Sequence, residues 1–206
     1  MIRIDHSGRN VVITGVGGSV GKAVARSFVE SGASVVGIDR KDRSNERLAG
    51  IRDEIDYYQC DLVDESEVKR TARRITGEYE AVHHLSNIVG GWIGGKGIHE
   101  TDLETYETVM DINLKTAFLM SKHLIPEIRA ANGSIVSISG RTSRAGGPKD
   151  GLYRASKAGV TRVTESIAEE NKGDMRANTI LPSVINTPEN RRLRPDEDHS
   201  RWVEPE

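Results

Sequence analysis

A tyrosine and a lysine four residues apart, Tyr153 and Lys157, lie in a segment whose apolar residues recur at helical spacing. Residues at this spacing share one face of a helix, so the phenol and the ammonium group would be neighbours. A tyrosine becomes an effective base near neutral pH only if its pKa falls by about three units from about 10. A nearby positive charge favours that change. The pair could therefore exchange a proton with an alcohol or carbonyl oxygen.

A glycine-rich turn follows the first apolar run of the chain. The run Asn10–Thr14 leads into Gly15-Val16-Gly17-Gly18-Ser19-Val20-Gly21 and then into a helix-like segment. Backbone N–H groups in such a turn, together with the start of a helix, can bind a pyrophosphate. We assign cofactor contacts in the turn to Gly15, Ser19, Val20 and Gly21.

Carboxylates end the next two β-rich runs. Asp39 lies about 20 residues after the glycines, where an acidic side chain can accept both ribose hydroxyls of an adenosine. Its charge would repel a 2′-phosphate and so favours NAD over NADP, whereas the adjacent Arg40 would attract such a phosphate. Asp61 is a candidate for the adenine edge or for an ordinary turn aspartate.

Alternating strands and helices must position these residues. Strands are predicted at Asn10–Thr14, Ser34–Asp39, Ile55–Cys60, Glu80–Leu85, Gly133–Ser139 and Met175–Ile180. Helices are predicted from about Ser19 and Ser44, and at Asp64–Thr76, Leu103–Ala130 and Leu152–Glu170. This order favours one α/β domain over residues 1–206, a Rossmann-type, doubly wound parallel sheet with helices on both faces.

Composition excludes several classes of function. The chain has 29 basic and 31 acidic residues without long runs of either sign, which argues against nucleic-acid and membrane partners. A single cysteine, Cys60, excludes an intrachain disulfide and favours a cytoplasmic protein. His83 and His84 point to opposite faces of a strand and lack a third ligand nearby, so no metal site is predicted.

In this order the motifs resemble those of the short-chain dehydrogenase/reductase family, over Asn10 to about Pro188. The turn after Thr14 resembles T-G-x-x-x-G-x-G with Ser19 in place of a glycine, and Tyr153 to Lys157 matches Y-x-x-x-K. Asn113 and the segment Asn87-Ile88-Val89-Gly90 have the expected places, although the segment matches only at its ends.

The resemblance implies roles for the remaining residues. Lys157 would also hold the nicotinamide ribose, Asn113 would anchor a proton-relay water, and Asn87 would support the cofactor from below. The stretch after the sixth strand would contact the nicotinamide carboxamide through Ile185 and Thr187.

The catalytic serine of the family is out of register here. In the family twelve residues separate this serine from the tyrosine, a count that falls on Gly140 here, while Ser139 is one position early. Since successive strand residues face opposite ways, this shift matters unless the strand bends. We assign the hydroxyl to Ser139 and keep Thr142 and Ser143 as alternatives.

The resemblance implies an oxidoreductase that transfers hydride between NAD and a secondary alcohol or ketone, in a homodimer or homotetramer. The alternative is a non-catalytic dinucleotide-binding sensor or scaffold. The family's final helix and seventh strand have no counterpart before Glu206, so the working protein would be longer or have its sheet edge covered by a partner subunit. Residues 188–206, rich in charge, would form a mobile substrate lid or a truncated end.

Overall fold

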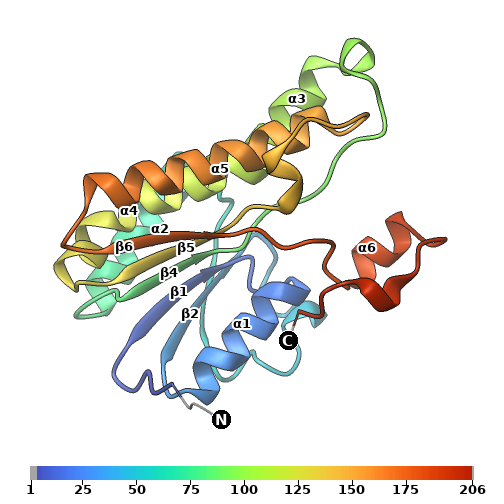
Figure 1. Cartoon of the computed structure of the whole chain (residues 1–206). Helices are drawn as coiled ribbons and strands as arrows, with labels where there is room; N and C mark the ends of the chain where they lie inside the picture. The colour runs from blue at the N-terminus through green and yellow to red at the C-terminus, as the bar shows by residue number, and fades with distance from the viewer. Residues whose placement is uncertain (1–3, 206) are drawn as a thin grey trace.

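Six parallel strands form a single sheet in the order β3-β2-β1-β4-β5-β6 in the computed structural model, which describes residues 4–205 (Figure 1). The strands are β1 (Asn10–Thr14), β2 (Ser34–Asp39), β3 (Asp56–Gln59), β4 (His84–Asn87), β5 (Ser134–Ile138) and β6 (Arg176–Ile180). The chain moves outward from β1 to β3 and then crosses back to β4. The connections that follow β1 and β4 therefore lead to opposite faces of the sheet. The crevice between these connections, at the carboxyl ends of the two strands, is the usual ligand site of such sheets.

Helices cover both faces of this sheet. They are α1 (Ser19–Glu30), α2 (Glu65–Glu78), α3 (Leu103–Met110), α4 (Thr116–Ala130), α5 (Gly151–Glu170) and α6 (Pro188–Leu193). Helix α1 lies on one face against β1 and β2, while α2, α4 and α5 lie on the other (Figure 1). The predicted Rossmann-type α/β fold is confirmed.

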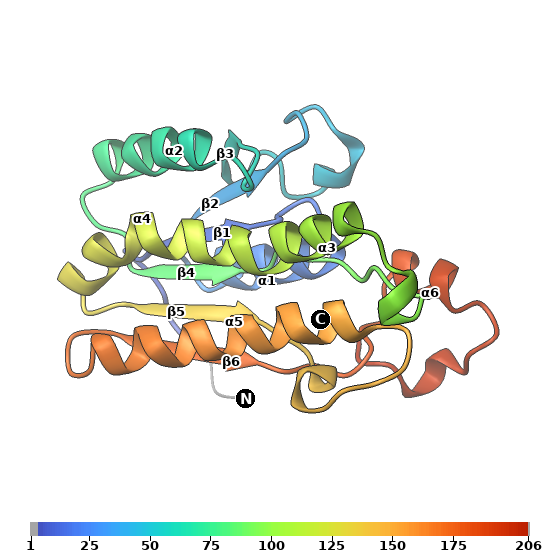
Figure 2. The same cartoon turned by 90° about the horizontal axis from the view of Figure 1, so that it is seen from above.

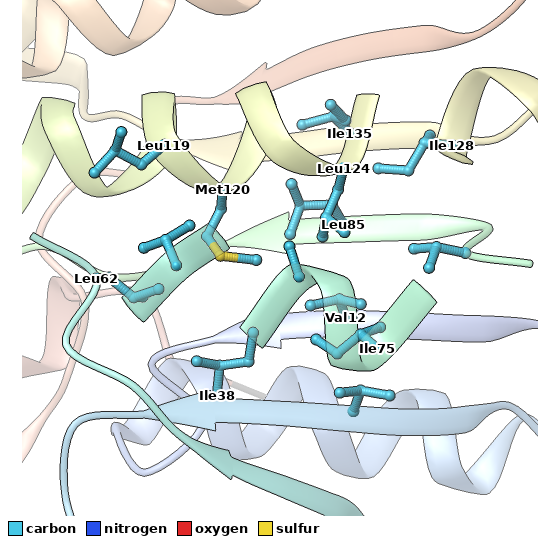
Figure 3. Close-up of a cluster of buried hydrophobic side chains, with 14 of the residues drawn as sticks. Val12, Ile38, Leu62, Ile75, Leu85, Leu119, Met120, Leu124, Ile128 and Ile135 are labelled. Atoms are coloured by element: carbon cyan, nitrogen blue, oxygen red, sulfur yellow. The ribbon is translucent and has the colours of Figure 1, made fainter. Parts of the chain in front are cut away.

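Two groups of apolar side chains hold these layers together. The larger group fills the space between the sheet and the helices α2, α4 and α5, and Figure 3 shows Val12, Ile38 and Leu85 of the sheet facing Ile75 and Leu124 of the helices. The smaller group joins α1 to the opposite face of β1 and β2. Strands buried on both faces read as continuous apolar runs, which is why β1 and β2 stood out in the sequence.

Three predicted elements differ from the structure. The helix from Ser44 is only a 3₁₀ turn at Glu46–Leu48, because side chains of Asp42 and Asn45 cap backbone N–H groups and form turns instead. The strand predicted at Glu80–Leu85 is β4, which begins only at His84 because α2 extends to Glu78 and pairing with β1 starts at that register.

The predicted helix Leu103–Ala130 is interrupted. It consists of α3 and α4 joined by a π-helical turn at Asp111–Lys115. Asn113 lies within this turn. Such turns insert one extra residue per turn and occur frequently at functional sites, and hydrophobic periodicity alone does not reveal them.

Strand β6 forms one edge of the sheet. Within residues 4–205 only β5 pairs with it, and Ile180 at its end is 52% exposed. After β6 the chain forms α6, beyond the carboxyl ends of β4 and β5 (Figure 2), and returns so that Ile185 pairs with Val203. That a partner subunit covers this edge, and that residues 188–206 are mobile, stay predictions.

Candidate active site

The glycine turn brings the start of α1 close to the end of β1. Gly15 has a φ of +68°, a conformation that favours glycine, and its carbonyl accepts a hydrogen bond from the Gly18 N–H at 3.0 Å. A β-carbon at Gly21 would lie only 2.1 Å from the same carbonyl oxygen. This close approach requires glycine and leaves the N-terminus of α1, with Ser19 and Val20 in its first turn, at the crevice beside β1.

Asp39 is connected directly to the glycine turn. Its Oδ2 accepts a hydrogen bond from the Gly17 N–H at 3.1 Å, and its Oδ1 accepts one from the Lys41 N–H at 3.2 Å. The carboxylate thus lies between the phosphate-type turn and the end of β2, as the ribose assignment needs. Asp61 accepts a hydrogen bond from the Val63 N–H, so it does form a turn. Its contact with adenine stays a prediction.

Tyr153 and Lys157 lie in the first two turns of α5. The Lys157 Nζ donates a hydrogen bond to the Ile138 carbonyl at 3.0 Å, and only 4% of this residue is exposed. Burial lowers the pKa of Lys157 to about 8. Burial also raises the pKa of Tyr153, an effect that the positive charge of Arg194 partly offsets. In the protein alone Tyr153 is therefore a neutral phenol that can donate a proton.

Asn113 is locked in place by its side chain. Its amide group donates to the Gly91 and Val109 carbonyls at 3.0 and 3.1 Å, and its Oδ1 accepts from the Gly91 N–H at 3.1 Å. A β-carbon at Gly90 would lie 2.7 Å from both Asn113 Oδ1 and Lys157 Nζ. The amide oxygen and the ammonium group therefore both pack closely against Gly90, and a side chain at this position would displace them.

Ser139 points away from the catalytic pair. It is 2% exposed, its Oγ donates to the Lys157 carbonyl at 2.7 Å, and it accepts a hydrogen bond from Thr161 at 3.0 Å. A β-carbon at Gly140, by contrast, would lie 3.7 Å from the Tyr153 hydroxyl oxygen. The strand keeps its alternation at this point, so position 140 faces Tyr153 while the Ser139 hydroxyl is occupied by α5. This geometry argues against our assignment of the substrate-side hydroxyl to Ser139.

Asn87 joins three elements beneath the crevice. It is 3% exposed, and its amide group donates to Ser121 of α4 and to Ser137 of β5. Its Oδ1 is buried without a protein partner. Its amide group therefore ties β4 to α4 and β5, and its support of a bound cofactor stays a prediction.

The stretch after β6 leads into α6. Thr187 is the N-cap of α6, where its hydroxyl accepts a hydrogen bond from the Asn190 N–H at 3.2 Å. Ile185 is fixed by its pairing with Val203. Both residues precede α6, and their contact with a carboxamide stays a prediction.

Two site residues were missed in the sequence. In the sequence Gly90 only ends a partial motif, but in the structure any side chain at this position would clash with Asn113 and Lys157. Arg154 was passed over as an intervening residue of Y-x-x-x-K, yet it anchors the turn after β5. Only its adjacency to Tyr153 could have drawn attention to it.

Among residues 4–205 no helix is long and apolar enough to cross a membrane, and no group of three or more histidine, cysteine, aspartate or glutamate side chains is arranged to hold a metal ion. His83 instead accepts a hydrogen bond from the Asn10 N–H, and His84 is hydrogen-bonded to Ser134.

Known proteins of the same kind match most of this chain. The 2,5-dichloro-2,5-cyclohexadiene-1,4-diol dehydrogenase of Sphingobium indicum is 30% identical over 190 residues, which cover 89% of this chain and 75% of that enzyme. The ligand-free aldohexose dehydrogenase of Thermoplasma acidophilum superposes with a TM-score of 0.86 at 26% identity, over 97% of this chain and 83% of that one. A short chain dehydrogenase of Escherichia coli complexed with NADPH has the same fold, with a TM-score of 0.91 at 22% identity, over 100% of this chain and 89% of that one. The profile of the family described as short chain dehydrogenase matches residues 9–198, and the chain therefore belongs to the short-chain dehydrogenase family of nicotinamide-dependent oxidoreductases.

Proposed function

We propose that this protein transfers hydride between NAD and a secondary alcohol or ketone. The observation that carries the proposal is the juxtaposition of Tyr153 and Lys157 on α5 with Asn113, whose amide oxygen packs against Gly90 together with the Lys157 ammonium group. The name of the Sphingobium relative, a cyclohexadienediol dehydrogenase, supports a secondary alcohol as the substrate class.

Each residue has a distinct task in this proposal. A bound nicotinamide supplies or accepts the hydride and, when oxidised, a positive charge. Tyr153 donates its proton to the carbonyl oxygen during reduction and takes it back during oxidation. Lys157 would hold the ribose of the nicotinamide, and its charge would favour the phenolate. Asn113 links the π-turn to Gly91 and would hold a relay water.

A turnover screen tests the proposal. The purified protein is mixed with NAD and a panel of secondary alcohols, or with NADH and the matching ketones, and the reduced cofactor is followed by absorbance. Turnover of at least one compound is expected. Cofactor binding without turnover of any compound would favour the sensor or scaffold alternative, which no feature of the structure or of the relatives supports.

The preference for NAD is proposed from the position of Asp39. Its carboxylate accepts a hydrogen bond from the Gly17 N–H of the glycine turn. Beside an adenosine ribose it would accept a hydrogen bond from the 2′-hydroxyl and repel a 2′-phosphate. We expect NAD to bind at least about tenfold more tightly than NADP, a difference of about 1.4 kcal/mol, in titrations of intrinsic fluorescence. Asp39→Ala should remove the preference, whereas Asp53→Ala, which removes an exposed carboxylate elsewhere, should leave it unchanged.

Equal or tighter NADP binding by the unmodified protein would contradict this proposal. In that case Arg40 outweighs Asp39, and Asp39→Ala would hardly change the ratio of the two dissociation constants. The Escherichia coli structure contains NADPH, but at 22% identity the likeness to it extends to the fold alone.

We infer that the protein forms a homodimer or homotetramer through α4 and α5. Phe118 on α4 is 46% exposed, and it lines an apolar groove of about 340 Å³ with Leu114 and with Val163 of α5. Light scattering should show an oligomer, and Phe118→Glu should shift it toward monomer because a charge would be buried. Arg129→Glu, at the exposed end of α4, is the control. A monomeric unmodified protein would contradict the inference.

We also place the protein in the cytoplasm. The proposal is supported by its single cysteine, Cys60, a buried free thiol that suits a reducing compartment.

A further inference from the structure

The turn after β5 places a threonine hydroxyl next to the position where a catalytic serine is missing. Strand β5 ends at Ile138, and the 3₁₀ turn Arg141–Arg144 follows. A β-carbon at Gly140 would lie 3.4 Å from Thr142 Oγ1 and 3.7 Å from the Tyr153 hydroxyl oxygen. Both are ordinary van der Waals distances, so the two hydroxyl groups flank the same point in space.

We propose that Thr142 supplies the hydroxyl that binds the reacting oxygen of the substrate, in place of a residue at position 140. The inference rests on the proposed function. In reduction the hydride adds to the carbonyl carbon and the proton of Tyr153 passes to the carbonyl oxygen. Thr142 donates a hydrogen bond to that oxygen throughout and has no net gain or loss of a proton.

The other hydroxyls of this region are less suited to the task. Ser139 is buried and committed to hydrogen bonds with Lys157 and Thr161. Ser143 lies further along the turn, and of the two only Thr142 is among the nearest neighbours of the Gly140 β-carbon position. Thr142 is half-buried, whereas Ser139 is enclosed by the protein.

Arg154 holds the turn that carries Thr142. Its Nε donates to the Asp150 carboxylate at 2.6 Å, and its Nη1 donates to the carbonyls of Ala145 at 3.2 Å and Gly146 at 3.4 Å. A β-carbon at Gly147 would lie 2.3 Å from the guanidinium carbon, so the backbone passes directly over this group. Arg154 therefore acts as a positioning residue that ties the turn to the same helix as Tyr153.

Kinetics of position 142 test the proposal. On a ketone found by the turnover screen, Thr142→Ala and Thr142→Val should each lower kcat by about 10²-fold, the usual cost of losing one donor at a reacting oxygen. Thr142→Ser keeps the hydroxyl and should retain most of the activity. Thr108→Ala, on the exposed side of α3, is the matched control. Unchanged cofactor affinity in each variant verifies that the fold is intact.

Moving the hydroxyl group from position 142 to position 140 provides a second test. Gly140 has a φ of −171°, extended backbone that any residue adopts, and a β-carbon there meets no atom closer than 3.4 Å. The double variant Gly140→Ser/Thr142→Ala should therefore have a kcat at least about tenfold higher than that of Thr142→Ala alone. Arg154→Ala should lower kcat as well, but should cost little more in the Thr142→Ala background, because both changes remove the same hydroxyl from its place.

Each other outcome has a definite meaning. If Thr142→Ala and Thr142→Val turn over within twofold of the unmodified protein, or if the large loss occurs in Ser139→Ala or Ser143→Ala instead, the assignment of Thr142 is wrong while the proposed function stands. If the unmodified protein turns over no alcohol or ketone, both the proposed function and this assignment are overturned.

Discussion

Tyr153→Phe is expected to lower kcat by about 10³-fold, within the range typical of a lost acid–base group. The change removes one oxygen atom, and burial already keeps this side chain within the protein, so the ring should stay in place. Cofactor affinity should change by less than twofold, because the hydroxyl acts mainly in the reaction step. Steady-state kinetics and a cofactor titration on the same preparation measure both quantities.

Tyr106→Phe is the matched control for this variant. Tyr106 lies on α3, is 44% exposed and is outside the candidate site. Its replacement should leave kcat unchanged. A Tyr153→Phe variant that keeps more than about a tenth of the activity would mean that the proton comes from another group, and the mechanism would then be wrong.

Lys157→Met is expected to have two opposite effects. Turnover and cofactor binding should both fall at least tenfold, because the variant loses the charge beside Tyr153 and the donor for the ribose. The free energy of unfolding should nevertheless rise at neutral pH. Burial lowers the pKa of Lys157 from 10.5 to about 8. Keeping this side chain protonated at neutral pH therefore destabilises the folded state by up to about 3 kcal/mol. The lost hydrogen bond to Ile138 offsets about 1 kcal/mol of this gain.

The pH dependence of stability distinguishes this cause from simple repacking. The folded pKa of Lys157 lies below the unfolded value, so the destabilising effect is complete below about pH 8 and vanishes as the pH rises to 10.5. The advantage of Lys157→Met in urea denaturation should therefore shrink between these two values. An advantage that stays constant over that range, or a variant less stable than the unmodified protein at pH 7, would contradict the argument.

Most of the fold could be predicted from the sequence because its inner strands are buried on both faces. β1 and β2 stand out as apolar runs, and both end where predicted, at Thr14 and Asp39. The segment after Ser44 could not be predicted in the same way, since capping by Asp42 and Asn45 competes with helix formation. The π-turn around Asn113 is invisible to periodicity because one added residue does not disturb the apolar pattern on either side.

The candidate site could likewise be predicted from the sequence only in part. The spacing of Tyr153 and Lys157 correctly placed both on one helix, since four residues make about one helical turn. The hydroxyl near Tyr153 depended instead on whether β5 keeps its alternation through residue 140, which no local pattern encodes. The backbone stays extended, so the Ser139 hydroxyl is bound to the Lys157 carbonyl while position 140 lies beside the Tyr153 hydroxyl.

Direct hydride transfer is the central claim, and a labelled cofactor tests it most directly. A ketone identified by the screen is reduced with NADH that carries deuterium at the transferable position of the nicotinamide, and the alcohol product is examined by mass spectrometry. The account predicts one deuterium on the carbinol carbon of the product, formed by the unmodified protein and not by Tyr153→Phe. A product without deuterium, or equal amounts of labelled product from both proteins, would contradict it.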